Sequence, residues 1–117
     1  MEWKGQSCAE SDAKSVLVTD AAQWKSLWRE AFGDSKPTPE VDFSTNVAVA
    51  VFVGTKRTGG YSVQFFEPSQ VGSSTVIGYS VKSPGSGMFV IQAFTTPYAI
   101  RLYPKPTSPV ELKSINP

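Results

Sequence analysis

The sequence predicts a single domain, residues 1–117, of mostly β structure: an antiparallel β-sandwich or half-barrel with one amphipathic helix packed against it. Two patterns support this. Between about residues 46 and 115, short apolar or alternating runs follow one another, separated by Gly, Pro and Ser, as strands and turns are. Residues 20–32 instead repeat their apolar side chains at helical spacing. The 117 residues, 40% of them hydrophobic, suffice for one core, and a domain of this size buries roughly 65% of its unfolded surface.

The predicted helix, about residues 20–32, has recognisable ends and one apolar face. Asp20 is a favourable N-cap, and Gln23 completes a capping-box pattern. Gly33 is a favourable C-cap, and the prolines that follow prevent continuation. The apolar face consists of Trp24, Leu27, Trp28 and Ala31. Tryptophans at this spacing could form a ligand platform, but they more often form core, and we expect these two to pack against the sheet.

The strands are expected in the following order. Residues 3–8 form a short first strand, and residues 15–18 form an edge strand or the lead-in to the helix. Residues 47–53 are apolar at nearly every position, as in a central strand covered on both faces. Further strands are predicted at residues 61–66, 77–81, 88–94 and 98–102, with a weaker one at 110–113.

Short loops without a crossover helix predict that successive strands are antiparallel neighbours. Loops 54–60, 83–87 and 104–109 then lie at one end of the sheet, and loops 67–74 and 95–97 at the other. The first end would carry Lys56, Arg57, Lys82 and Lys105 without a carboxylate, whereas Glu67 lies at the second. We therefore expect a basic rim, although a solvated surface is the ordinary explanation for such a charge run.

The composition argues against an enzyme. The chain has no histidine, which excludes the usual Ser-His and Cys-His pairs and imidazole metal sites. Between residues 47 and 103 the only carboxylate is Glu67, so the sheet cannot supply paired carboxylates or an oxygen-ligand metal site. We expect no catalytic residue, metal or cofactor. The single Cys8 is expected to be a free, partly buried thiol.

The composition also limits the binding partners. The net charge of +1 gives no general reason to expect nucleic acid. Tyr61 and Tyr98 could stack on bases beside Lys56 and Arg57, but four cations are few for a single-strand binder, which ranks third. No run is apolar enough to span a membrane. A small-ligand module would need a deep apolar pocket, which a sequence does not reveal.

The glycine loop, residues 54–60, is the strongest candidate for a site. Lys56, Arg57 and Thr58 precede Gly59 and Gly60, and Tyr61 follows. Gly-Gly between strands indicates a chain reversal, and a turn that only folds the chain would explain it. A recognition loop, however, also benefits from a neighbouring cation and ring. Arg57 would then donate to a carboxylate or carbonyl, the glycines would let a partner backbone approach, and Tyr61 would anchor the loop.

The glycine loop and two later stretches together resemble the PrcB C-terminal domain family. They are residues 54–61, residues 84–88 (Pro84, Gly85, Ser86, Gly87, Met88) and residues 92–98. Residues 24–28 and 41–44 are also similar, so that the resemblance covers roughly residues 16–105. It implies a non-catalytic partner of a secreted protease complex. The chain is accordingly expected to be extracytoplasmic (periplasmic or secreted), with any signal segment outside this sequence.

The glycine loop also resembles that of the chagasin-type protease inhibitors, which present three loops at one end of a β-sandwich. The resemblance is limited to Thr58, Gly59, Gly60 and Tyr61, because Lys56 and Arg57 replace the Asn-Pro that precedes the inhibitor motif. The sequence thus favours a domain that binds a protein, with a protease as the candidate partner, and leaves inhibition as the alternative. The predicted partner-binding residues are Lys56, Arg57, Thr58, Gly59, Gly60, Tyr61, Pro84, Gly85, Gly87, Met88 and Lys105.

Overall fold

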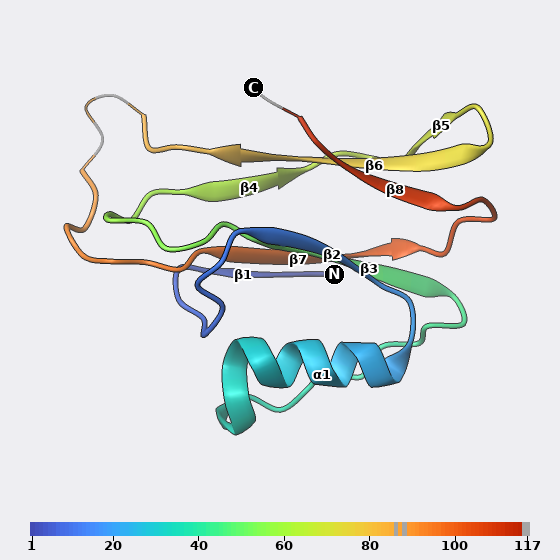
Figure 1. The fold of residues 1–117 in the computed structure, drawn as a ribbon, viewed down its shortest axis with the longest axis horizontal. Coiled ribbons are helices and arrows are strands. Elements are labelled where there is room, and N and C mark those ends of the chain that lie inside the picture. The colour runs from blue at the N-terminus through green and yellow to red at the C-terminus, as the bar shows by residue number, and fades with distance from the viewer. Residues whose placement is uncertain (86, 88, 116–117) are drawn as a thin grey trace.

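Two β-sheets and one helix form three layers in the computed structural model, which describes residues 1–85, 87 and 89–115. The first sheet lies between the helix and the second sheet (Figure 1). One apolar cluster fills the space between the helix and the first sheet, and another fills the space between the two sheets. The predicted fold, mostly β with one packed helix, is confirmed.

The first sheet has the order β1-β7-β3-β2, and all its pairs are antiparallel. Its members are β1 (Glu2–Gly5), β2 (Lys14–Val18), β3 (Asn46–Phe52) and β7 (Tyr98–Pro104). β3 is buried on both faces, as predicted. Ala48, Ala50 and Phe52 face the helix, whereas Val47, Val49 and Val51 face the second sheet. This alternation is the period-2 geometry of a strand.

The second sheet is built around the long strand β6 (Ser74–Lys82). β4 (Ser62–Phe65) and β5 (Ser69–Val71) pair with successive parts of β6 in antiparallel orientation. β8 (Val110–Ser114) is parallel to β6, so the expectation that all neighbours are antiparallel is wrong at this pair. The parallel orientation is possible because the chain passes through the whole of β7 before it returns to β6.

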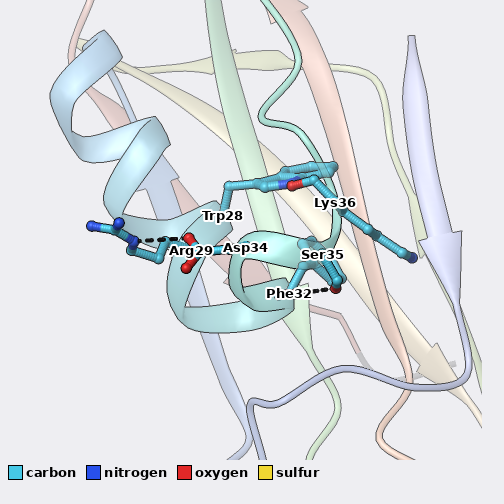
Figure 2. Close-up of polar contacts among 6 residues, drawn as sticks. All are labelled: Trp28, Arg29, Phe32, Asp34, Ser35 and Lys36. Atoms are coloured by element: carbon cyan, nitrogen blue, oxygen red, sulfur yellow. Dashed lines mark hydrogen bonds and ion pairs between the residues drawn. The ribbon is translucent and has the colours of Figure 1, made fainter.

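Helix α1 (Ala21–Phe32) begins and ends where the sequence predicts. The backbone N–H of Gln23 donates to the Asp20 carboxylate at 2.7 Å. Gly33 adopts a φ of 66° and leads into the 3-10 turn η1 (Gly33–Ser35). Figure 2 shows how Asp34 in this turn faces Arg29 of the last helical turn, 3.3 Å away. Among the described residues, no helix is long and apolar enough to cross a membrane.

The two helix tryptophans belong to the core, as expected. Trp24 and Trp28 are 2% and 5% exposed. Their ring centroids lie 5.4 Å apart, and Trp3 of β1 packs against both. Each indole N–H is satisfied by a backbone carbonyl, that of Trp24 by Pro39 and that of Trp28 by Lys36. Buried indoles with these partners are typical of a structural cluster.

The predicted strand at residues 88–94 is absent among its described residues, 89–94, which follow an irregular path. Met88 lies outside the described residues. The connection that contains this segment leaves β6 in the second sheet and enters β7 in the first. Because it changes sheet, it cannot form a hairpin with β6, and the local preference for strand is overridden by the topology.

The expected distribution of loops between the two ends is also wrong from residue 95 onward, because residues 89–94 form no strand and so do not carry the chain from one end of the sheet to the other. Thr95 pairs with Lys56 and therefore lies beside the glycine loop. Lys105 lies at the opposite end, where its N–H donates to the carbonyl of Thr45, next to the start of β3. Figure 1 shows the glycine loop and the 83–97 connection at one end, and the β7–β8 connection at the other.

Candidate functional site

Beyond the first sheet, the chain segments that continue β3 and β7 still pair with each other. Val53 N–H donates to Pro97 O at 3.0 Å, Lys56 and Thr95 exchange two hydrogen bonds of 2.8 Å, and Gly59 N–H donates to Ile91 O at 3.0 Å. Between the pair Phe52–Tyr98 and the pair Lys56–Thr95, the segment that contains Gly54 has one residue more than the opposite segment. Gly54 takes a φ of 87°, as in a β-bulge. We call residues 54–60 and 89–97 together the arm.

The two glycines are packed against the chain's own residues. A Cβ at Gly59 would lie 2.8 Å from Ile91 Cγ1. At Gly60, where φ is 90°, it would lie 2.7 Å from Val90 Cγ1 and 3.0 Å from Pro84 Cβ. Contacts this short leave no room for a side chain. The space that we expected to admit a partner backbone is therefore occupied by Pro84, Val90 and Ile91 of the same chain.

Tyr61 lies at the base of the glycine loop and contacts Lys56 and Gln6. Lys56 Nζ lies 5.1 Å from the centroid of its ring, and the side chain of Gln6 donates to its backbone carbonyl at 2.9 Å. On the other strand of the arm, the Thr95 hydroxyl donates to Thr58 O at 2.8 Å. These contacts hold Lys56 and Thr58 in place inside the arm.

Arg57 is the exposed cation of the arm. Among the described residues it has no ion pair, in contrast to Arg29 and Arg101. Lys82, at the end of β6, is also exposed. The surroundings are not free of carboxylates, because Thr55 N–H donates to Ser11 O and so places residues 10–12 beside the loop. Glu10 there pairs with Lys14 at 2.9 Å, whereas Asp12 is exposed.

The most unusual feature of the arm is its exposed apolar side chains. Phe89, Ile91 and Phe94 are 104%, 61% and 77% exposed. Neighbouring large apolar side chains in open solvent mark interaction surfaces, because burial would normally stabilise them. Sequence reasoning missed this feature, because it predicts a regular strand of the sheet at residues 88–94. The signal was present in Pro84, Gly87 and Pro97, which interrupt regular pairing around the segment.

The structure brings most of the predicted site residues to one end of the molecule. Residues 56–61 lie in the glycine loop or at its base, and Pro84 packs near Gly60. Gly85 and Gly87 belong to the same connection, whereas Lys105 lies at the other end. Met88 is outside the described residues.

Alternative sites are weaker. A cleft of about 640 Å³ lies between α1 and residues 38–43. Its aromatic wall is Trp24, which is buried and whose indole N–H already donates to Pro39 O. The Cys8 thiol donates to Thr96 O at 3.4 Å, and burial raises its pKa. A protonated, half-buried thiol is a poor nucleophile. Within the described ranges, no three Cys, Asp and Glu side chains gather as metal ligands would.

Comparison with protein families finds one match. The model of the PrcB C-terminal family matches residues 47–101, which confirms the resemblance expected from the sequence. The matched segment runs from β3 into β7 and includes the whole arm. The comparisons with curated proteins and with solved structures found no match.

Proposed function

We propose that this chain, whose residues 47–101 match the model of the PrcB C-terminal family, is a non-catalytic protein-interaction domain that binds its partner through the arm. The observation that supports this most is the exposure of Phe89, Ile91 and Phe94 on one segment. Burying each such side chain at an interface contributes about 1.5–3 kcal/mol. Aromatic anchors of this kind are frequent among the residues that dominate binding energy.

The arm is suited to present these side chains. Two hydrogen bonds between Lys56 and Thr95 and one between Gly59 and Ile91 tie its two segments together. The close packing of Gly59 on Ile91, and of Gly60 on Pro84 and Val90, adds to this restraint. A surface that is ordered before binding loses less conformational entropy when the partner docks.

The family match supports a partner in a protease complex, and therefore an exported protein acting in the periplasm or outside the cell. A non-catalytic role agrees with a sequence that has no histidine and in which Glu67 is the only carboxylate between residues 47 and 103. Glu67 is engaged by Arg101 at 2.7 Å. We therefore propose that the domain recruits or stabilises a protease without doing chemistry of its own.

Inhibition has less support than assembly. An inhibitor of the chagasin type would insert its glycine loop into the protease cleft. Here Gly59 is buried against Ile91, and Gly60 faces Pro84 and Val90. The side chains that protrude are those of residues 89–94, on the opposite segment of the arm.

A binding experiment tests the proposal. The wild type and the double variant Phe89→Ser/Phe94→Ser are immobilised and compared for binding of subtilisin-like and papain-like proteases and of proteins from a secreted or periplasmic extract. Val71→Ser is the control, because Val71 is also an exposed apolar residue, 59% exposed, but lies on β5. We expect the double variant to lose a partner that the control retains, while bound protease still cleaves its substrate.

Two outcomes would contradict the proposal. Equal retention of every partner by the wild type and the double variant would show that the exposed rings do not bind. Stoichiometric loss of protease turnover on addition of the wild type would replace assembly by inhibition. Far-UV circular dichroism of each variant confirms that folding is unchanged, as expected for substitutions of exposed residues.

A further inference from the structure

Residues 89–94 have the sequence of a strand but not the hydrogen bonds of one. Phe, Val and Ile at positions 89–91 favour extended structure. Among the described residues, the backbone of this segment makes one hydrogen bond, from Gly59 N–H to Ile91 O. The remaining N–H and C=O groups of the segment are available to an incoming chain. Unpaired backbone in an apolar segment that favours extended structure can serve as a template for strand addition, with the bend at Gln92 and Ala93 straightening as the new strand pairs.

The side of the segment on which a new strand would lie follows from the sheet order. β7 pairs with β3 on one side and with β1 on the other. In the arm, the segment that follows β3 still pairs with the segment that precedes β7, as far as Gly59. The continuation of β1 ends earlier: Gln6 accepts from Thr96 N–H, and Cys8 contacts the Thr96 hydroxyl. Beyond Thr96, no described residue hydrogen-bonds the segment on the β1 side.

The charges near this open position indicate the occupant. Residues 54–60 and 89–97 contain Lys56 and Arg57 but no Asp or Glu. Lys4 on β1 and Lys82 at the end of β6 add further exposed cations at this side of the molecule. A second copy of the chain pairing arm to arm would bring like charges together without a carboxylate from either arm. An acidic segment of another protein would instead be attracted, and Arg57 would offer it a forked donor.

We propose that residues 89–94 bind an extended segment of the partner protein by strand addition, in line with β1, and that this segment alternates apolar side chains with carboxylates. This inference rests on the proposed function and specifies how the arm recognises its partner. Backbone hydrogen bonds would hold the segment, Phe89 and Ile91, which share one face of an extended strand, would cover its apolar side chains, and the cations would select its charge.

The probe for this proposal is a synthetic peptide of alternating Glu and Val, titrated against the folded domain and followed by amide NMR shifts and hydrogen exchange. A peptide of alternating Lys and Val is the charge control, and the Glu-Val peptide N-methylated at every second residue is the backbone control. We expect the Glu-Val peptide to bind with protection of amides in residues 89–94. Each control peptide should bind at least about tenfold more weakly.

Variants of the domain separate backbone pairing from side-chain contact. Gln92 is exposed and its backbone has no partner among the described residues. Gln92→Pro removes one donor and should weaken Glu-Val binding by about tenfold or more, whereas Gln92→Ala keeps the donor and should not. A change in the amide spectrum outside residues 89–94 would mean that Gln92→Pro alters the fold. In that case the N-methylated peptide, titrated against the wild-type domain, tests whether backbone hydrogen bonds hold the peptide. Arg57→Ala should reduce the preference for Glu-Val over Lys-Val.

Several outcomes would overturn strand addition. These are absence of Glu-Val binding up to about 1 mM, equal binding of the N-methylated peptide, and protection of residues 89–94 by concentration-dependent dimers of the domain itself. If the Phe89→Ser/Phe94→Ser variant loses the natural partner but the peptide tests fail, the proposed function stands and only the mode of recognition is wrong. If both fail, the arm is not an interaction surface.

Discussion

Replacing Trp28 by alanine tests the packing that holds the helix on the sheet. The indole lies 5.4 Å from the Trp24 ring, 5.8 Å from Trp3 and 4.5 Å from Phe32, measured between centroids. Its N–H donates to Lys36 O at 3.2 Å and so fastens the turn after the helix, as Figure 2 shows. One substitution therefore removes contacts to β1, to α1 and to the following turn.

The magnitude follows from burial. Truncation of a buried tryptophan to alanine costs about 3–5 kcal/mol, because transfer energy is lost and a cavity remains. Lys36 is exposed, so its carbonyl can bond to water, and no penalty for an unsatisfied acceptor is added. We expect a loss of about 4 kcal/mol in the free energy of unfolding, out of the 5–15 kcal/mol typical of a domain. The melting temperature should fall by roughly 12–24 °C.

Urea unfolding followed by far-UV circular dichroism measures this loss without relying on tryptophan fluorescence. Trp28→Phe is the matched control: it keeps an aromatic ring in the cluster, loses the hydrogen bond to Lys36 and should cost clearly less than Trp28→Ala. A loss below about 1 kcal/mol for Trp28→Ala would refute the reasoning, since a side chain 5% exposed cannot be removed so cheaply from a well-packed core. Unchanged stability together with lost partner binding would make the ring a ligand surface.

Two further predictions concern the arm and the cysteine. Gly60→Ala should destabilise the domain by about 1–3 kcal/mol, and by more than the control Gly72→Ala. Both glycines have positive φ, but only a Cβ at position 60 meets neighbouring atoms within 4 Å. Equal unfolding free energies of the two variants in urea would contradict this. Because burial raises the pKa of the Cys8 thiol, its alkylation by iodoacetamide should require higher pH in the folded protein than in urea; a lower or equal pH midpoint in the folded state would show that the thiol is activated.

The helix could be predicted because its signals are local. The Asp20 cap, the apolar face that includes Trp24 and Trp28, and Gly33 lie within a few turns of one another, and each acts on the helix itself. The central position of β3 could also be read from its sequence, because a strand apolar at every position needs cover on both faces.

Strand partners could not be predicted in the same way, since pairing depends on residues distant in the chain. β3 pairs with β2 and β7, which precede and follow it by many residues, rather than with the adjacent β4. The rule that consecutive strands are neighbours therefore concealed the parallel pairing of β8 with β6, in which no turn connects the two strands directly. Lys105 was misplaced at the glycine-loop end because a strand was predicted at residues 88–94, whereas residues 89–94 form none.

The candidate site was predicted in part. Residues 56–61 were singled out by the Gly-Gly turn and its flanking cation and ring, and Pro84 lies where it was expected, beside the glycines. The reason for the glycines was different, because they face Val90 and Ile91 rather than open solvent. The exposed rings of Phe89 and Phe94 were missed because an apolar run alone does not distinguish a covered strand from one without a partner.

The segment on which sequence and structure disagree most is also the segment proposed to bind. Residues 89–94 have the composition of a covered strand, yet the fold covers neither their rings nor most of their backbone groups. When local preference and tertiary structure conflict in this way, the chain carries a cost in stability that binding can relieve. An added strand would supply both missing elements, backbone partners and cover for Phe89 and Ile91. The strand preference of this segment is then explained by the bound state, and weakening that preference should reduce partner affinity more than it reduces the stability of the free domain.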